Sequence, residues 1–204
     1  FFGKRFPGLF ADGTDEFTMH RRYSILYHEA YRPMIPEEGG FLLCRAGSYG
    51  DQVNGCVIWP GDIDANFAQQ GDERVDKDGE PYKAAGGLPG AVIMGSSLGL
   101  SGYPLFASDT GGYLNAPPTK ECFLRWTQFS AFSPAMQVGT NTNDLPWSFG
   151  TDKVYDEELL DTYRIYARIH LRLYPYLWTA WKDVQNTGRA IQRPLGFAYP
   201  ELEA

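Results

Sequence analysis

The most informative segment of the sequence is Gly55-Cys56-Val57-Ile58-Trp59-Pro60-Gly61-Asp62. It is a short apolar run without polar alternation, bounded by glycine and ending in a turn that carries a carboxylate. Residues 39–47 and 103–109 form further runs of this kind. Such runs are typical of strands that are buried on both faces, as in a parallel sheet covered by helices.

Segments with helical character alternate with these strands. We expect helices at residues 18–34, 88–100, 119–132 and 156–183. Pro175 should kink or divide the last helix, because proline cannot donate within a helix interior. Further strands are expected at residues 6–12, 135–139 and 188–195, and an exposed loop at 69–85. The alternation predicts an α/β fold with a parallel sheet, and alone it is compatible with an open doubly wound sheet or a (β/α)8 barrel.

Composition excludes several classes of protein. The 204 residues include 18 basic and 25 acidic side chains, for a net charge of −7. This balance argues against a partner that is nucleic acid or an anionic membrane, and no apolar run is long enough to span a bilayer. The three cysteines are far apart without a CxxC pair, so we expect neither a disulfide framework nor a zinc site. No phosphate-binding glycine motif is present, and no cofactor is expected.

Polar side chains gather where the predicted strands end. The ends carry Asp12, Arg45, Trp59 with Asp62, and Asp109. In parallel α/β architectures the functional groups collect at these carboxyl ends. Carboxylates beside an aromatic side chain, without histidine, are typical of glycoside cleavage, which needs one carboxylate nucleophile and one carboxylic acid. A Mg²⁺ or Ca²⁺ site is the alternative for such a cluster.

Six motifs then point to a family. They are Cys44-Arg45-Ala46-Gly47-Ser48, Trp59-Pro60-Gly61-Asp62, Gly99-Leu100-Ser101-Gly102, Ser108-Asp109-Thr110-Gly111-Gly112-Tyr113, Leu145-Pro146-Trp147 and Arg193-Pro194-Leu195. In this order and spacing the chain resembles glycoside hydrolase family 31. The resemblance implies the C-terminal half of a (β/α)8 TIM barrel, about strands 4 to 8, over residues 1–186, with the start of a following β-rich domain at 187–204. The chain does not begin with Met, and we expect it to be part of a longer protein.

The resemblance also implies roles for the candidate residues. Asp12 is expected to be the nucleophile and Asp62 the general acid/base, while Arg45, Trp59 and Asp109 hold the substrate. The implied activity is that of a retaining exo-acting α-glycoside hydrolase on an α-linked oligosaccharide, with α-glucosidase as the first expectation. The alternatives are an α-transglycosylase, an α-xylosidase and a non-catalytic carbohydrate-binding relative. Compartment and oligomeric state are left open.

One segment departs from the family pattern, in which an Arg-x-His sequence contacts the sugar. The corresponding residues here are Gln137-Val138-Gly139, which implies a different set of contacts, with Asn141 or Asn143 as candidates. Structural alternatives also exist for each candidate. Asp12 or Asp109 could occupy a turn, Asp62 could cap a helix, Trp59 could pack in the core, and Arg45 could form a structural ion pair. Asp15 or Glu16 could replace Asp12 as the functional carboxylate.

Overall fold

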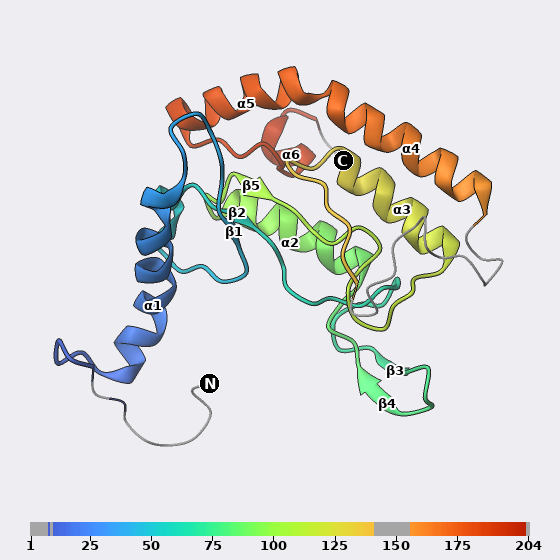
Figure 1. Cartoon of the computed structure of the whole chain (residues 1–204), viewed down its shortest axis with the longest axis horizontal. Helices are drawn as coiled ribbons and strands as arrows, with labels where there is room; N and C mark the ends of the chain where they lie inside the picture. Colours follow the sequence, from blue (N-terminus) through green and yellow to red (C-terminus); the bar gives the residue numbers. More distant parts are fainter. Residues whose placement is uncertain (1–7, 9, 141–155, 203–204) are drawn as a thin grey trace. The chain divides into compact units, whose positions relative to one another are not determined.

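The structure, a computed structural model, describes residues 8, 10–140 and 156–202 (Figure 1). It divides into two compact units, residues 1–58 and residues 59–204. Each unit contains helices and short strands, so the described part of the chain has the α/β character that the sequence predicts.

The first unit pairs two parallel strands beside a long helix. Its elements are α1 (Glu16–Tyr31), the 3-10 helix η1 (Arg32–Met34), β1 (Leu43–Cys44), the 3-10 helix η2 (Asp51–Asn54) and β2 (Val57–Ile58). Asp15 caps α1, because its carboxylate accepts a hydrogen bond from the Thr18 amide. Leu43 lies opposite Val57 in the parallel pair. The parallel pairing expected of these two apolar runs is therefore confirmed, although the regular strands are shorter than the runs.

The second unit contains most of the helices. Its elements are β3 (Glu73–Val75), β4 (Pro81–Lys83), α2 (Leu88–Leu100), β5 (Leu105–Phe106), α3 (Lys120–Ala131), α4 (Glu157–Arg172), α5 (Tyr174–Thr187) and α6 (Leu195–Ala198). Thr119 caps α3 by accepting from the Cys122 amide, as expected from its hydroxyl. The long C-terminal helix divides at Leu173, and Pro175 lies in the first turn of α5, as predicted (Figure 1).

The core of the second unit is built around Trp126 on α3. Its indole is fully buried, and its N–H donates a 3.0 Å hydrogen bond to the Ser108 hydroxyl. Helix α2 approaches this core through its glycines. A Cβ on Gly95 would lie 2.9 Å from the Phe106 ring, and one on Gly99 only 2.2 Å from the Gln192 carbonyl oxygen. Small residues are required there because there is no space for a side chain.

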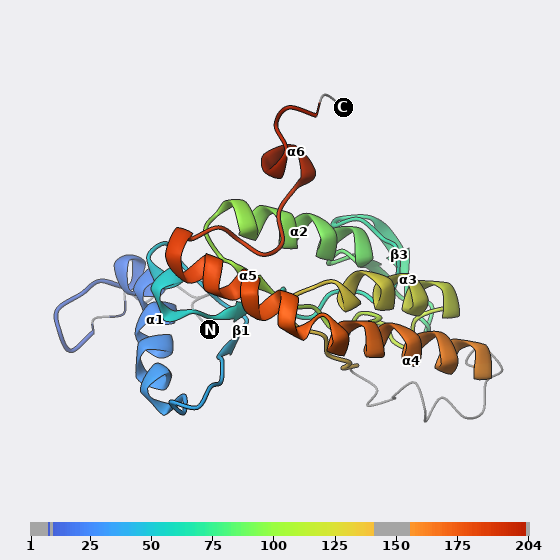
Figure 2. The same ribbon diagram turned by 90° about the horizontal axis from the view of Figure 1, so that it is seen from above.

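Helices α3 and α4 pack side by side, as both views show (Figure 2). The Phe123 and Tyr163 rings meet at 5.6 Å between centroids, and Leu159 is fully buried. At one end, Lys120 donates to Asp156 at 2.8 Å, and Asp156 also accepts from the Leu159 amide as the cap of α4. These contacts fix the start of α4 against α3.

Several predicted elements differ from the structure. Residues 69–85 are not a plain loop, because β3 and β4 pair there as an antiparallel hairpin. Residues 135–139 form only an isolated bridge, between Gln137 and Asp109. The described residues 188–195 contain no strand, and the short α6 begins at Leu195. The assignment of residues 187–204 to a β-rich domain stays a prediction. Of the strand expected at 6–12, the described residues 8 and 10–12 do not form a strand, and the other three lie outside the described residues.

Helices α4 and α5 also expose an apolar surface. Leu171, Tyr174 and Trp178 lie at helical spacing, which is typical of core positions, yet each is about half exposed or more. Within the described part of the chain, none of the helices combines the length and apolar character that a bilayer crossing needs.

Candidate active site

Asp109 is the most deeply buried of the three carboxylates in the candidate site. It follows β5 and is 5% exposed. The Trp59 indole N–H donates a 2.7 Å hydrogen bond to its Oδ2 atom, and the Gln137 amide donates a 2.9 Å bond to Oδ1. The Thr110 amide also donates to the Gln137 carbonyl at 2.9 Å, which extends the bridge between the two segments. The carboxylate is thus held in one orientation by two neutral donors.

Gln137 was identified from the sequence only as a departure from the family pattern. The structure shows what this residue does, since its side chain binds the carboxylate of Asp109. Trp59 is also more than a core aromatic residue, because its N–H is committed to the same carboxylate and its ring is only partly buried. Together Trp59, Asp109 and Gln137 form a polar network within the second unit.

Asp62 lies in a turn that opens onto a cavity. Gly61 precedes it with a φ of 85°, a conformation that favours glycine. Asp62 lines a cavity of about 390 Å³ together with Gln70 and Met94. It does not cap a helix, because α2 begins after Gly87. A half-buried carboxylate on a cavity wall is suited to proton transfer.

Asp64, two residues further on, is a structural carboxylate that the sequence analysis did not single out. It is 1% exposed and accepts 2.6 Å hydrogen bonds from the Ala85 amide and the Asn115 side chain. Its buried charge also contributes, after desolvation, to raising the pKa of Tyr82. Asp64 therefore anchors the base of the β3–β4 hairpin, whereas Asp62 lies on the wall of the cavity.

Asp12 lies in an exposed turn before α1. The Thr14 amide donates to its Oδ1 atom at 2.9 Å, and Arg22 lies 3.9 Å from Oδ2. The hydroxyl and amide of Thr14 lower the pKa of Asp12 below its ordinary value, which keeps the carboxylate ionised as a nucleophile requires. The neighbouring Asp15 is occupied by capping the helix.

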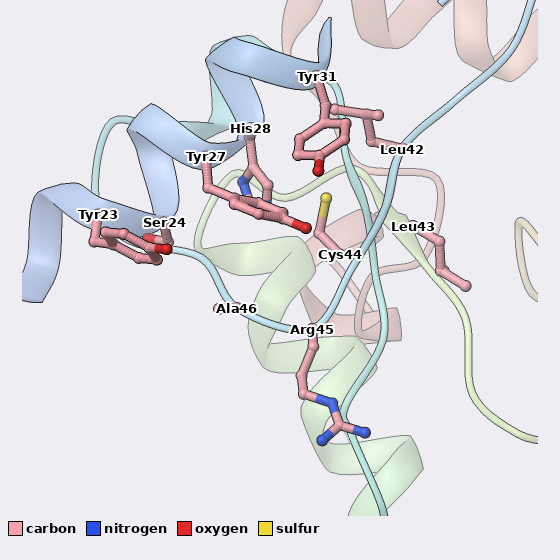
Figure 3. Close-up of a pocket in the computed structure, with 10 residues that line it drawn as sticks. All are labelled: Tyr23, Ser24, Tyr27, His28, Tyr31, Leu42, Leu43, Cys44, Arg45 and Ala46. Carbon is pink, nitrogen blue, oxygen red and sulfur yellow. The ribbon is translucent and has the colours of Figure 1, made fainter. Parts of the chain in front are cut away.

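Arg45 directly follows Cys44 at the end of β1, and its side chain is exposed. Figure 3 shows the guanidinium directed away from the tyrosine side chains of α1. Of the five predicted site residues, the structure brings Trp59 and Asp109 into direct contact. The joint placement of Asp12 and Arg45 with the other three remains a prediction, because the two groups belong to different units.

Comparisons with known proteins agree on one family. Residues 81–180 match the sequence profile of the glycosyl hydrolases family 31 TIM-barrel domain. An alpha-xylosidase of Emericella nidulans is 29% identical over 98% of this chain and 23% of its own length. A sulfoquinovosidase of Escherichia coli is 30% identical over 93% of the chain and 26% of its own length. The solved structure of a cycloalternan-forming enzyme from Listeria monocytogenes, in complex with a pentasaccharide substrate, superposes with a TM-score of 0.76 at 26% identity, covering 95% of this chain and 17% of that one.

The chain therefore belongs to glycoside hydrolase family 31, and it is an α/β portion of the TIM-barrel domain of that family. It spans about a quarter of the length of these curated relatives. Its relatives include α-glycosidases with several different substrates.

Proposed function

We propose that the full-length protein is a retaining exo-acting α-glycoside hydrolase, with Asp12 as nucleophile and Asp62 as general acid/base. The observation that carries this proposal is the hydrogen bond from Trp59 to Asp109 in a chain of this family. It joins an aromatic ring to an oriented carboxylate that follows a strand, and the active sites of TIM barrels lie at the carboxyl ends of strands. An aromatic ring packs on the apolar face of a sugar, and a carboxylate accepts from its hydroxyls.

In the proposed mechanism the Asp12 carboxylate attacks the anomeric carbon. Asp62 gives its proton to the leaving oxygen as that bond breaks, and a β-glycosyl-enzyme forms. Asp62 then removes a proton from water, which attacks the anomeric carbon and displaces Asp12. The two inversions return the α configuration, and they require carboxyl groups about 5–5.5 Å apart.

For the substrate we propose α-glucosides first, with α-xylosides second because an alpha-xylosidase is among the relatives. The hydrogen bond from Gln137 to Asp109 supports a sugar-binding surface that differs from the Arg-x-His pattern. Transfer to a second sugar is a further candidate, because the chain resembles a cycloalternan-forming enzyme. Hydrolysis rates on aryl α-glucoside, α-xyloside and α-sulfoquinovoside would rank the sugars. Products from maltose alone would separate glucose release from transfer.

Azide rescue tests the two aspartates separately. In the Asp62→Ala variant, substrates with good leaving groups should still form the glycosyl-enzyme, and azide should intercept it to give the α-glycosyl azide. In Asp12→Ala, azide should replace the nucleophile and give the β-glycosyl azide. Asp78→Ala, on the exposed hairpin, serves as the control and should behave like the parent. The assignment is wrong if both variants give the same anomer or if Asp12→Ala retains hydrolysis.

A further inference from the structure

The first unit contains a buried cluster of metal-ligating side chains that the glycosidase mechanism does not use. His28, Cys44 and Cys56 come from α1, from β1 and from the residue before β2. One ligand atom from each lies within 4.8 Å of those of the other two. All three residues are buried, with exposed fractions of 3–4%. The wide separation of the cysteines in sequence had given no reason to expect this convergence.

A second layer of polar groups orients the histidine. Asp51, on η2, is fully buried, and its Oδ2 atom lies 2.6 Å from Nδ1 of His28. The other oxygen of Asp51 accepts a 2.7 Å hydrogen bond from the Asn54 amide. Because Asp51 occupies Nδ1, the Nε2 atom of His28 is the one left to bind a ligand. A carboxylate that holds a histidine in this way is the usual support of a metal-bound imidazole.

We propose that His28, Cys44 and Cys56 bind one thiophilic divalent cation of the Zn²⁺ class. Two thiolates and one imidazole are the donors that such an ion prefers over oxygen. Bonds of about 2.3 Å to sulfur and about 2.0–2.1 Å to nitrogen in a tetrahedral arrangement place the ligand atoms about 3.6–3.8 Å apart. The three ligand atoms lie within 4.8 Å of one another, so the cluster reaches this spacing with a contraction of about 1 Å.

The donor set of the cluster matches the charge of a dication. Two thiolates neutralise a dication, and the imidazole binds without charge. Cysteine binds a cation as the thiolate, so binding of the ion would release protons. Asp51 contributes a further negative charge in the second layer, which strengthens the imidazole as a ligand.

The fourth coordination position can be reached from solvent. Cys44 and His28 line a cavity of about 480 Å³ together with Tyr27 and Tyr31. Figure 3 shows the Cys44 sulfur directed toward these tyrosines, while Arg45 points the other way. Water from the cavity is therefore the expected fourth ligand, and the cavity is the entry path for the ion.

Cobalt titration of the reduced, metal-free, full-length protein tests this proposal. Co²⁺ should bind one per chain and give the thiolate-to-cobalt charge-transfer absorption of a tetrahedral site, and Zn²⁺ should displace it. Cys44→Ser and Cys56→Ser should each abolish this absorption. Cys122→Ser is the matched control, because Cys122 is also a buried free thiol but lies on α3, and it should bind like the parent. Asp51→Asn should weaken binding about 10- to 100-fold.

A second measurement keeps the test decisive if a serine variant does not fold. Zn²⁺ should then raise the melting temperature of the parent and of Cys122→Ser, and protect two of the three thiols from alkylation. The proposal is overturned if the parent shows no cobalt charge-transfer band, if Cys122→Ser loses it, or if the isolated protein contains a Cys44–Cys56 disulfide. None of these results would affect the glycosidase proposal, which is tested on Asp12 and Asp62.

Discussion

The indole N–H of Trp59 donates a 2.7 Å hydrogen bond to the carboxylate of Asp109, across 50 residues of sequence. This contact predicts that Trp59→Phe lowers kcat/KM about 10- to 150-fold, because a hydrogen bond to a charged group contributes about 1.5–3 kcal/mol. Trp126→Phe is the control, since it loses a bond to Ser108 within the core. It should lower the melting temperature and leave kcat/KM within about threefold. Equal effects of the two variants on kcat/KM would contradict a role for Trp59 in the site.

Gln137 holds the other oxygen of Asp109, and changing its charge should make activity depend on pH. In Gln137→Glu, two carboxylates face each other, and their repulsion raises the pKa of the pair. At pH 7 the repulsion displaces Asp109, and kcat/KM should fall. Below the raised pKa, one shared proton restores a donor, so the activity relative to the parent should rise as the pH falls from 7 to 5. A ratio that is constant with pH would contradict this contact.

Thr14 keeps the Asp12 carboxylate ionised, and its removal should shift the acid side of the pH profile. Thr14→Val loses the hydroxyl that contributes most to lowering the pKa of Asp12. The fall of kcat/KM at low pH should therefore begin at a higher pH than in the parent. Thr18→Val is the matched control, because the Thr18 hydroxyl contacts Asp15 instead. The profile of that control should not move, and a shift in both variants would argue against Asp12.

Removal of Asp62 should abolish turnover, whereas removal of Asp64 should lower the stability of the fold. Asp64→Ala leaves the Ala85 amide and the Asn115 side chain without their acceptor, which should lower the free energy of unfolding by about 2–5 kcal/mol. Asp62→Ala should retain stability within about 1 kcal/mol and lose turnover. Denaturant unfolding together with aryl glycoside hydrolysis distinguishes the two. A loss of stability from Asp62→Ala that matches that of Asp64→Ala would make Asp62 a structural residue.

Helix α2 offers a test of packing. Gly99→Ala places a methyl group 2.2 Å from the Gln192 carbonyl oxygen, and the backbone must move to accommodate it. We expect a loss of stability of about 1–3 kcal/mol, as for other overpacked positions. Gly90→Ala meets only Met94 at 3.7 Å and should be neutral or stabilise by up to about 1 kcal/mol. Thermal unfolding measures both, and a stable Gly99→Ala variant would contradict the close approach.

The helices could be predicted from the sequence much better than the strands. Helix α2 begins and ends where its apolar run does, and the division before Pro175 follows from the chemistry of proline. The regular strands are shorter than their apolar runs, because strand bounds depend on the pairing partner rather than on local sequence. The hairpin in residues 69–85 was missed because its strands are exposed and charged, without apolar alternation.

The sequence predicts the candidate site only at residues whose type and position after an apolar run indicate their chemistry. Trp59 and Asp109 could be named from their positions after apolar runs, and their contact is confirmed. Asp64 and Gln137 could not be assigned tasks, since their partners are 21 or more residues away in sequence. The cluster of His28, Cys44 and Cys56 could not be predicted either, because only the folded chain brings these three residues together.

Trapping of the glycosyl-enzyme shows which residue forms the covalent bond to the sugar. The full-length protein would be treated with a slow-turnover 5-fluoro-glycosyl fluoride, digested and examined by mass spectrometry. We expect a glycosylated peptide with the sugar on Asp12, and Asp12→Ala should remain unlabelled. A sugar attached to Asp15, Glu16 or any other residue in an active preparation would contradict the claim.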